Sequence, residues 1–192
     1  MKKEEKLYVI NIIMNYQQIC NYLMRHKYPI LTSRPALKGY EGEIQRGFAL
    51  GYVFNRPPQQ QKYNTKPFVK CSRLKWKNNQ ELFDNTCKFF KHYYPREFKF
   101  STIQYNYNCR ASKHIDGNNI GESVIIAMGD YTGGRLIVYD ENDKPQYYDI
   151  KHKFLRFNGS KYYHEVEPFQ GNRLSLVFFN LLEGTDQEHL LI

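Results

Sequence analysis

His114 and Asp116 lie two residues apart in the segment HIDGNNIGES, 114–123. Residues at this spacing in an extended chain point to the same side, so the imidazole and the carboxylate can bind one metal ion together. His164 is the best candidate for a third ligand, because it lies in YYHEVEPF, a predicted strand with apolar neighbours. Two histidines and one carboxylate make a facial triad that holds Fe(II) and leaves coordination positions open. Zinc accepts the same ligands, so the triad alone does not select the metal.

Arg173 favours iron over zinc. It begins the last predicted strand, NRLSLVFF, nine residues after His164. A permanently charged guanidinium in an apolar strand needs a partner, and a dicarboxylate cosubstrate would supply one through paired hydrogen bonds. Ser175 lies two residues further on, on the same face, and can donate another hydrogen bond to that carboxylate. Without the upstream ligands, Arg173 would more simply be a solvent-exposed residue at a strand edge.

The order H-x-D, distal His and R-x-S resembles that of the Fe(II)/2-oxoglutarate dioxygenase superfamily. The similar segments are NYNC-x4-HIDGNNIGES, IIAMGDYTGGRLIVYD and FNGSKYYHEVEPFQGNRLSLVFF, which cover most of 100–180. The resemblance implies that His114, Asp116 and His164 bind Fe(II), and that Arg173 with Ser175 binds the distal carboxylate of 2-oxoglutarate. The implied enzyme uses O₂ to hydroxylate a C–H bond and releases succinate and CO₂, with ascorbate as reductant.

Within that superfamily, the sequence around the triad is most similar to that of the TET/JBP-type nucleic-acid base oxygenases, which have relatives in viruses, fungi and protists. The similar features are N-x-N before H-x-D, N-x-G-x-S after it, GDYTGG, and PF-x-G-x-R. AlkB-type repair enzymes have a second arginine six positions after the first, where this chain has Phe179, and collagen-type prolyl hydroxylases usually have lysine in place of Arg173. The resemblance implies oxidation of the methyl group of thymine or 5-methylcytosine in DNA or RNA. The Cys-rich region of the larger animal TET proteins is missing here, which weakens the case for duplex recognition by that route.

Five further polar residues are candidates for contacts with the cosubstrate or the substrate. Asn106 and Asn108 share one face of the strand before the metal motif, and we expect Asn106 to contact 2-oxoglutarate and Asn108 the substrate. Both would otherwise be polar residues at the edge of a ladder. Asn118 and Asn119 are expected either to contact the substrate or to shape a turn. Arg46 precedes the apolar run GFALGYVF and is expected to cover the mouth of the site.

Aromatic and basic side chains are the remaining candidates for a nucleic-acid contact. Tyr105 or Tyr107 would face the cavity, depending on strand register. The run KCSRLKWK, 70–77, contains three lysines, one arginine and the only tryptophan, and is either a nucleic-acid face or solvated surface. A net charge of +9 and a pI of about 9.3 suit a polyanionic partner, although an AT-rich genome would also produce a chain rich in Lys, Asn and Tyr.

The elements that must position these residues are mostly short strands. FKFSTIQYNYNC alternates in polarity, and later apolar runs are separated by turn segments, which predicts a sandwich or small barrel. The resemblance implies a double-stranded β-helix, a jelly-roll barrel. We therefore predict a mainly β (α+β) fold in a single domain over 1–192, with helices and strands of 1–95 supporting a barrel over 96–183. Predicted local features are a strand LYVINI, helices near 16–25 and 78–94, a Pro- and Gln-rich loop 56–67, and a hairpin turn at Gly133–Gly134.

Composition limits the environment of the protein. The four cysteines, Cys20, Cys71, Cys87 and Cys109, do not have the spacing of a zinc ribbon. No apolar run approaches the roughly 20 residues that span a bilayer, and no signal peptide is evident. We expect a soluble, intracellular monomer of the nucleus or cytoplasm. Three functions stay open: oxidation of a nucleic-acid base, the same chemistry on a protein side chain or small molecule, and a non-catalytic jelly-roll binding module.

Overall fold

The computed structural model describes residues 13–31, 44–54, 68–70 and 76–181. In chain order, the elements in these ranges are α1 (Tyr16–Met24), β1 (Arg46–Phe54), β2 (Phe68–Lys70), α2 (Trp76–Tyr93), β3 (Thr102–Tyr107), β4 (Ser123–Met128), β5 (Tyr131–Gly133), β6 (Leu136–Tyr139), β7 (Pro145–Tyr148), β8 (Leu155–Phe157), β9 (His164–Val166), β10 (Phe169–Gly171) and β11 (Leu174–Phe179).

The larger sheet has the strand order β2-β1-β3-β11-β4-β8 and is antiparallel throughout. Its last strand in sequence, β11, lies at the centre between β3 and β4. In this register Ser175 is opposite Asn106 on one side and Ala127 on the other. The R-x-S segment is therefore inside the sheet, next to the strand that precedes the H-x-D motif.

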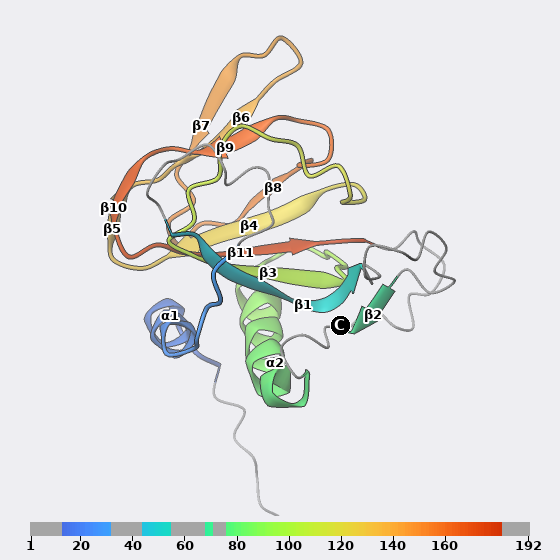
Figure 1. The fold of residues 1–192 in the computed structure, drawn as a ribbon, viewed down its shortest axis with the longest axis vertical. Coiled ribbons are helices and arrows are strands. Elements are labelled where there is room, and N and C mark those ends of the chain that lie inside the picture. The colour runs from blue at the N-terminus through green and yellow to red at the C-terminus, as the bar shows by residue number, and fades with distance from the viewer. Residues whose placement is uncertain (1–12, 32–43, 55–67, 71–75, 182–192) are drawn as a thin grey trace, which may run out of the picture.

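The smaller layer covers the opposite face of the larger sheet from the helices (Figure 1). It consists of the sheet β7-β6-β9 and the pair β10-β5. The two pairings share one register, since Gly133 is opposite Phe169 and Leu136 is opposite Val166, so the two strands run as one bent ribbon. Two facing antiparallel layers form the double-stranded β-helix, and the predicted mainly β fold class is confirmed.

Strand β4 explains how one sheet serves two cores. All six of its residues are buried, because alternate side chains enter different layers. Val124, Ile126 and Met128 join the core under the helices, whereas Ile125 and Ala127 join the cluster between the two sheets. This is why SVIIAM is a continuous apolar run rather than an alternating one.

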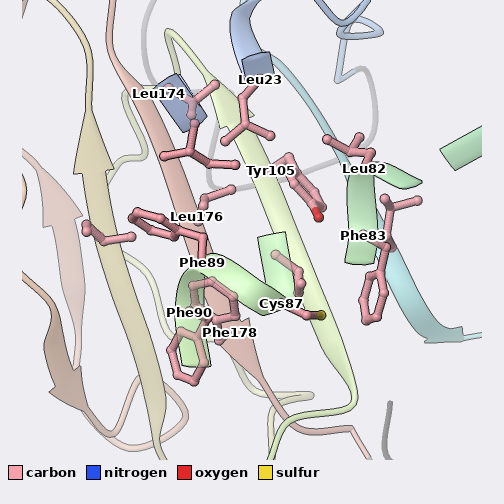
Figure 2. Close-up of a cluster of buried hydrophobic side chains, with 14 of the residues drawn as sticks. Leu23, Leu82, Phe83, Cys87, Phe89, Phe90, Tyr105, Leu174, Leu176 and Phe178 are labelled. Atoms are coloured by element: carbon pink, nitrogen blue, oxygen red, sulfur yellow. The ribbon is translucent and has the colours of Figure 1, made fainter. Parts of the chain in front are cut away.

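The two helices pack on the outer face of the larger sheet (Figure 1). A capping box begins α1, with the Asn15 side chain accepting from the Gln18 backbone and the Gln18 side chain accepting from the Asn15 backbone. Figure 2 shows Phe89 and Phe90 of α2 against the strands of the sheet. The Phe90 and Phe178 ring centroids are 4.2 Å apart. The predicted helices near 16–25 and 78–94 are confirmed, with small shifts at their ends.

The prediction of a hairpin turn at Gly133–Gly134 is wrong. Gly133 ends β5 and Gly134 precedes β6, and the chain continues in the same direction. Both glycines have positive φ, 75° and 67°, a conformation that strains other residues. The doublet bends the strand opposite Pro168, whose carbonyl accepts from Gly134 N at 3.0 Å. The two glycines do adopt the positive φ angles that the predicted turn would need, but the chain does not reverse direction there.

Several predictions fall outside the described residues. These are the strand LYVINI, the Pro- and Gln-rich loop 56–67, Cys71, and the side chains of the basic run 70–77. Neither α1 nor α2 is long and apolar enough to cross a bilayer, and they are the helices of the described ranges.

Candidate metal and 2-oxoglutarate site

His114, Asp116 and His164 meet at one point of the structure. His114 Nε2 is 3.6 Å from Asp116 Oδ1, and His164 Nε2 is 3.6 Å from Asp116 Oδ2. The potential ligand atoms all lie within 4.8 Å of one another. Atoms that share one metal at about 2.1 Å each lie roughly 3 Å apart on one face of an octahedron. The three residues thus form a cluster that could hold a metal ion once their ligand atoms move closer together.

Both histidine rings are held in the same way. Nδ1 of His114 is 2.6 Å from the carbonyl oxygen of Ser112, and Nδ1 of His164 is 3.1 Å from that of Tyr162. A carbonyl only accepts, so Nδ1 of each neutral ring carries the proton and Nε2 keeps its lone pair. Each Nε2 is the atom that faces Asp116. Ligand histidines in metalloproteins are fixed by outer hydrogen bonds of this kind.

The backbone brings the three residues together. His114 and His164 form an isolated antiparallel bridge and exchange hydrogen bonds of 3.0 and 2.9 Å. Asp116 N donates to the carbonyl of Gly159 at 2.9 Å. A Cβ added at Gly159 would lie 3.4 Å from Cε1 of His164 and 3.3 Å from a ring carbon of Phe157, which is tight. The loop before β9 is therefore shaped to the metal cluster.

Asn119 contacts the candidate ligand Asp116. Its Nδ2 is 3.4 Å from Asp116 Oδ2 and 3.5 Å from the hydroxyl of Ser123, and its backbone N donates to the Asp116 carbonyl at 2.8 Å. Asn118 is exposed, beyond these contacts. The two neighbouring asparagines therefore differ: Asn119 contacts the candidate ligand Asp116, whereas Asn118 is exposed to solvent.

Arg173 lies inside the protein with 1% of its surface exposed. Its guanidinium carbon is 5.6 Å from the ring centroid of Tyr131 and 5.7 Å from that of Phe169. Nε and Nη2 of Arg173 have no hydrogen-bond partner in the described part of the chain. A Cβ added at Gly134 would lie 3.1 Å from Cδ and Nε of Arg173, so the glycine makes room for the side chain.

Within the described ranges, the charge of Arg173 has no carboxylate neighbour. Burial lowers the pKa of Arg173, and the hydroxyl of Tyr131 and the thiol of Cys109 partly offset this effect. Burial also raises the pKa of Tyr131, and the charge of Arg173 opposes that rise. Arginine stays ionised in proteins. A buried cation with two unused donors is suited to an anionic ligand.

Ser175 and Asn106 extend the polar strip that begins with Arg173. They are directly opposite each other in the β3–β11 ladder, and Asn106 Nδ2 is 3.5 Å from the Ser175 hydroxyl. Ser175 is 3% exposed. Arg173 and Ser175 share one face of the chain, because they are two residues apart. The candidate cosubstrate residues therefore lie on the barrel side of the central strands.

The remaining candidates have other contacts in the described residues. Arg46 is opposite Tyr107 in the β1–β3 ladder, and its Nη1 donates to the Tyr28 carbonyl at 3.2 Å. Tyr105 and Tyr107 both pack with the core under the helices, so the prediction that one of them faces the cavity is wrong. Tyr105 and Tyr107 are two residues apart, so their side chains lie on one face of β3 and that of Asn106 lies on the other. Asn108 contacts the backbone of Arg173.

Sequence reasoning missed the residues that surround the guanidinium. Tyr131, Phe169 and Gly134 come from the quoted segments GDYTGG and PFQG, but no spacing rule assigns them a role. The available signal was the glycine doublet, since a glycine next to a bulky buried side chain often marks close approach. Gly159 in FNGS carried the same signal.

Three cations near the metal cluster in sequence are paired with carboxylates. Lys113, which precedes His114, pairs with Asp143. Arg156 of β8 pairs with Glu122, and Lys161 pairs with Glu141 at 2.8 Å. Each of these three positive charges is therefore neutralised by a neighbouring carboxylate.

The chain matches no family model and no curated protein in sequence. In structure it is similar to an oxidoreductase of the 2OG-Fe(II) oxygenase family from Burkholderia pseudomallei, with 17% identity, a TM-score of 0.53, and coverage of 87% of this chain and 80% of that one. NgTET1 in complex with 5mC DNA aligns at 15% identity and a TM-score of 0.46 over 70% of this chain and 60% of that one. A prolyl hydroxylase from Trichoplax adhaerens, in complex with a hypoxia inducible factor peptide fragment, aligns at 14% and 0.46 over 90% of this chain and 77% of that one. The chain thus shares the double-stranded β-helix fold of the Burkholderia oxidoreductase.

Proposed function

We propose that this protein is an Fe(II)- and 2-oxoglutarate-dependent dioxygenase that hydroxylates a C–H bond. The observation that carries the proposal is the pairing of two features in one barrel. One is the cluster of His114, Asp116 and His164, and the other is the buried guanidinium of Arg173 with two unused donors. A binding module without catalysis would need neither an iron-type ligand set nor a buried cation that lacks a counter-ion.

The residues present fit both groups. Two neutral imidazoles and one carboxylate suit Fe(II) and leave positions open for other ligands. The absence of a Cβ at Gly134 leaves room for the Arg173 side chain, whose unused nitrogens suit a carboxylate. Aromatic rings of Tyr131 and Phe169 flank the guanidinium, so water has little access and the charge–charge interaction is strengthened.

Iron and 2-oxoglutarate bound here would supply O₂ activation, in which 2-oxoglutarate, O₂ and a substrate C–H give succinate, CO₂ and the alcohol. The protein's own groups orient and protect this chemistry. His114, Asp116 and His164 hold the metal on one side. Arg173 binds the distal carboxylate, and Ser175 and Asn106 contact the same ligand from β11 and β3. The ring of Phe157, 5.1 Å from that of His164, would shield this ligand from water.

Turnover by the reconstituted protein tests the proposal. The protein is loaded anaerobically with Fe(II), 2-oxoglutarate and ascorbate, O₂ is admitted, and succinate is measured with and without candidate substrates. His164→Ala should abolish succinate formation, whereas His92→Ala, at an exposed histidine of α2, should not. Absence of succinate in every condition, or undiminished turnover of His164→Ala, would contradict the proposal.

For the substrate, we propose the methyl group of a nucleic-acid base, 5-methylcytosine or thymine, in DNA or RNA. Two features support this substrate: the TET/JBP-like sequence around the triad and the net charge of +9. A base in a duplex would have to leave the stack to reach the barrel. The ion pairs of Lys113, Arg156 and Lys161 indicate that phosphate contacts would come largely from other parts of the basic surface.

The same ion pairs favour a second candidate, a protein side chain or a small molecule. Where these three cations are neutralised by carboxylates, an uncharged substrate would be suited better than a polyphosphate. Mass spectrometry of nucleosides after turnover on methylated DNA and RNA separates the candidates. Hydroxymethylated bases would support the first, and succinate release that only peptides or small molecules stimulate would support the second.

A further inference from the structure

Asn108 completes the β3–β11 ladder at the residue that bears the guanidinium. The last backbone pair of that ladder is Tyr107 opposite Leu174. One position further on, Asn108 N donates to the Arg173 carbonyl at 2.8 Å, as in a regular ladder. The return bond is different, because Arg173 N donates at 2.8 Å to the side-chain Oδ1 of Asn108. An amide side chain therefore takes the place of a backbone carbonyl.

The backbone of Asn108 explains this substitution. Its φ is +51°, in the left-handed region that Asn and Gly tolerate best among the twenty residues. That conformation turns the chain out of β3, so the segment leading to His114 leaves the sheet. The chain leaves the sheet after Asn108, and the side-chain amide oxygen of Asn108 accepts the hydrogen bond from Arg173 N. The buried backbone N–H of Arg173 therefore has a partner.

Asn172 fixes the amide of Asn108 from the other strand. Its Oδ1 accepts from Nδ2 of Asn108 at 3.4 Å and from the hydroxyl of Tyr107 at 2.9 Å. The backbone N of Asn172 donates to the Asp130 carbonyl at 2.8 Å. We refer to Asn108 and Asn172 as the asparagine latch. It joins the end of β3, the start of β11 and the turn before β5.

We propose that the asparagine latch positions Arg173 for the carboxylate of 2-oxoglutarate, with Asn108 as its positioning residue. This rests on the proposed function. No carboxylate of the described residues holds the guanidinium, so its location follows from its backbone, from the hydroxyl of Tyr131 and from packing against Gly134. A displacement of about 1 Å is enough to weaken a paired interaction strongly. Asn108 therefore acts through Arg173, and not by touching the substrate as its sequence position suggested.

Binding of 2-oxoglutarate to the Mn(II)-loaded protein, measured by calorimetry without O₂, tests this role. Asn108→Gly keeps the backbone conformation but removes the acceptor, and should weaken 2-oxoglutarate binding by about tenfold, the effect of one lost buried hydrogen bond. Mn(II) affinity should be unchanged. Asn108→Asp retains an acceptor oxygen and should bind 2-oxoglutarate more tightly than Asn108→Gly. Asn142→Gly, the same change at an exposed turn residue, is the matched control.

The kinetic readout is a rise in KM for 2-oxoglutarate with kcat at saturation nearly unchanged. Asn172→Ala, which leaves the bond from Arg173 in place, should give a smaller rise and serves if Asn108→Gly does not fold. Equal 2-oxoglutarate affinity in wild type and Asn108→Gly overturns the latch, as does a matching loss of Mn(II) affinity. If the wild type itself fails to bind 2-oxoglutarate, the proposed function fails as well, so the two failures are distinguishable.

Discussion

His114 and His164 lie opposite each other on a two-residue antiparallel bridge and exchange both backbone hydrogen bonds, at 3.0 and 2.9 Å. Such a pair fixes the Cα atoms about 5.5 Å apart. Together with the hydrogen bonds at each Nδ1, this bridge brings the two ring centroids to 4.2 Å from each other. Fifty residues of sequence separate these two residues, and the smaller layer brings them together.

Metal removal should leave the fold intact and lower its stability by linkage alone. Because main-chain groups and not the ligand side chains make the bridge, Mn(II) at 100 times its Kd should stabilise the protein by about 2.7 kcal/mol. Thermal unfolding with Mn(II) and with a chelator measures this, and far-UV circular dichroism should not change. His114→Ala should lose the metal-dependent shift, whereas unfolding of the wild type on chelation would contradict a preformed site.

Gly159→Ala should weaken metal binding by about tenfold, the lower range for groups that orient a ligand. The new methyl group would press on Cε1 of His164 and on the ring of Phe157. Gly117→Ala is the matched control, since its Cβ would meet nothing within 4 Å although it follows Asp116 directly. Mn(II) titration of both variants measures the effect. Equal Mn(II) affinities of the two variants would mean that the loop before β9 accommodates the methyl group without displacing the metal cluster.

Arg173→Met should abolish 2-oxoglutarate binding and leave the protein equally stable or more stable. Replacing an unpaired buried charge by an apolar side chain is often neutral or stabilising, here by about 1–2 kcal/mol. For a chain of this size each kcal/mol corresponds to about 2–4 °C in Tm. Arg25→Met, at an exposed arginine, should change neither property. A fall of Tm by several degrees would show that the guanidinium is satisfied without the cosubstrate.

Alkaline pH should destabilise the smaller layer through Tyr139. The hydrogen bond to Glu165, together with burial, raises the pKa of Tyr139 from 10.0 to about 12. A raised folded pKa gives stability that is present below pH 10 and is lost as pH rises toward 12. Tyr139→Phe should make unfolding less dependent on pH in that window, as followed by urea titration. Because the residue is partly exposed, the effect should be small, and identical slopes in both proteins would contradict it.

The fold and the approach of the triad could be predicted because they depend on residue type and period. Short alternating runs indicated the sandwich, and H-x-D with a distal histidine indicated a cluster that the structure brings together. Features that depend on backbone conformation could not be predicted. The positive φ of Asn108 converts a strand-edge asparagine into a partner of Arg173, and nothing in NYNC signals it. Tyr105 and Tyr107 were misassigned because a strand pattern leaves open which face meets which layer.

The shared central sheet also limits how this protein can be divided. Strand β11 sends Leu174, Leu176 and Phe178 toward the helices while Arg173 and Ser175 lie on its other face. A fragment containing only the predicted barrel, 96–183, would expose that apolar row to water and invite self-association. The helical layer is therefore part of the minimal unit for expression. Grafting β11 into another scaffold would require other residues to cover its apolar face.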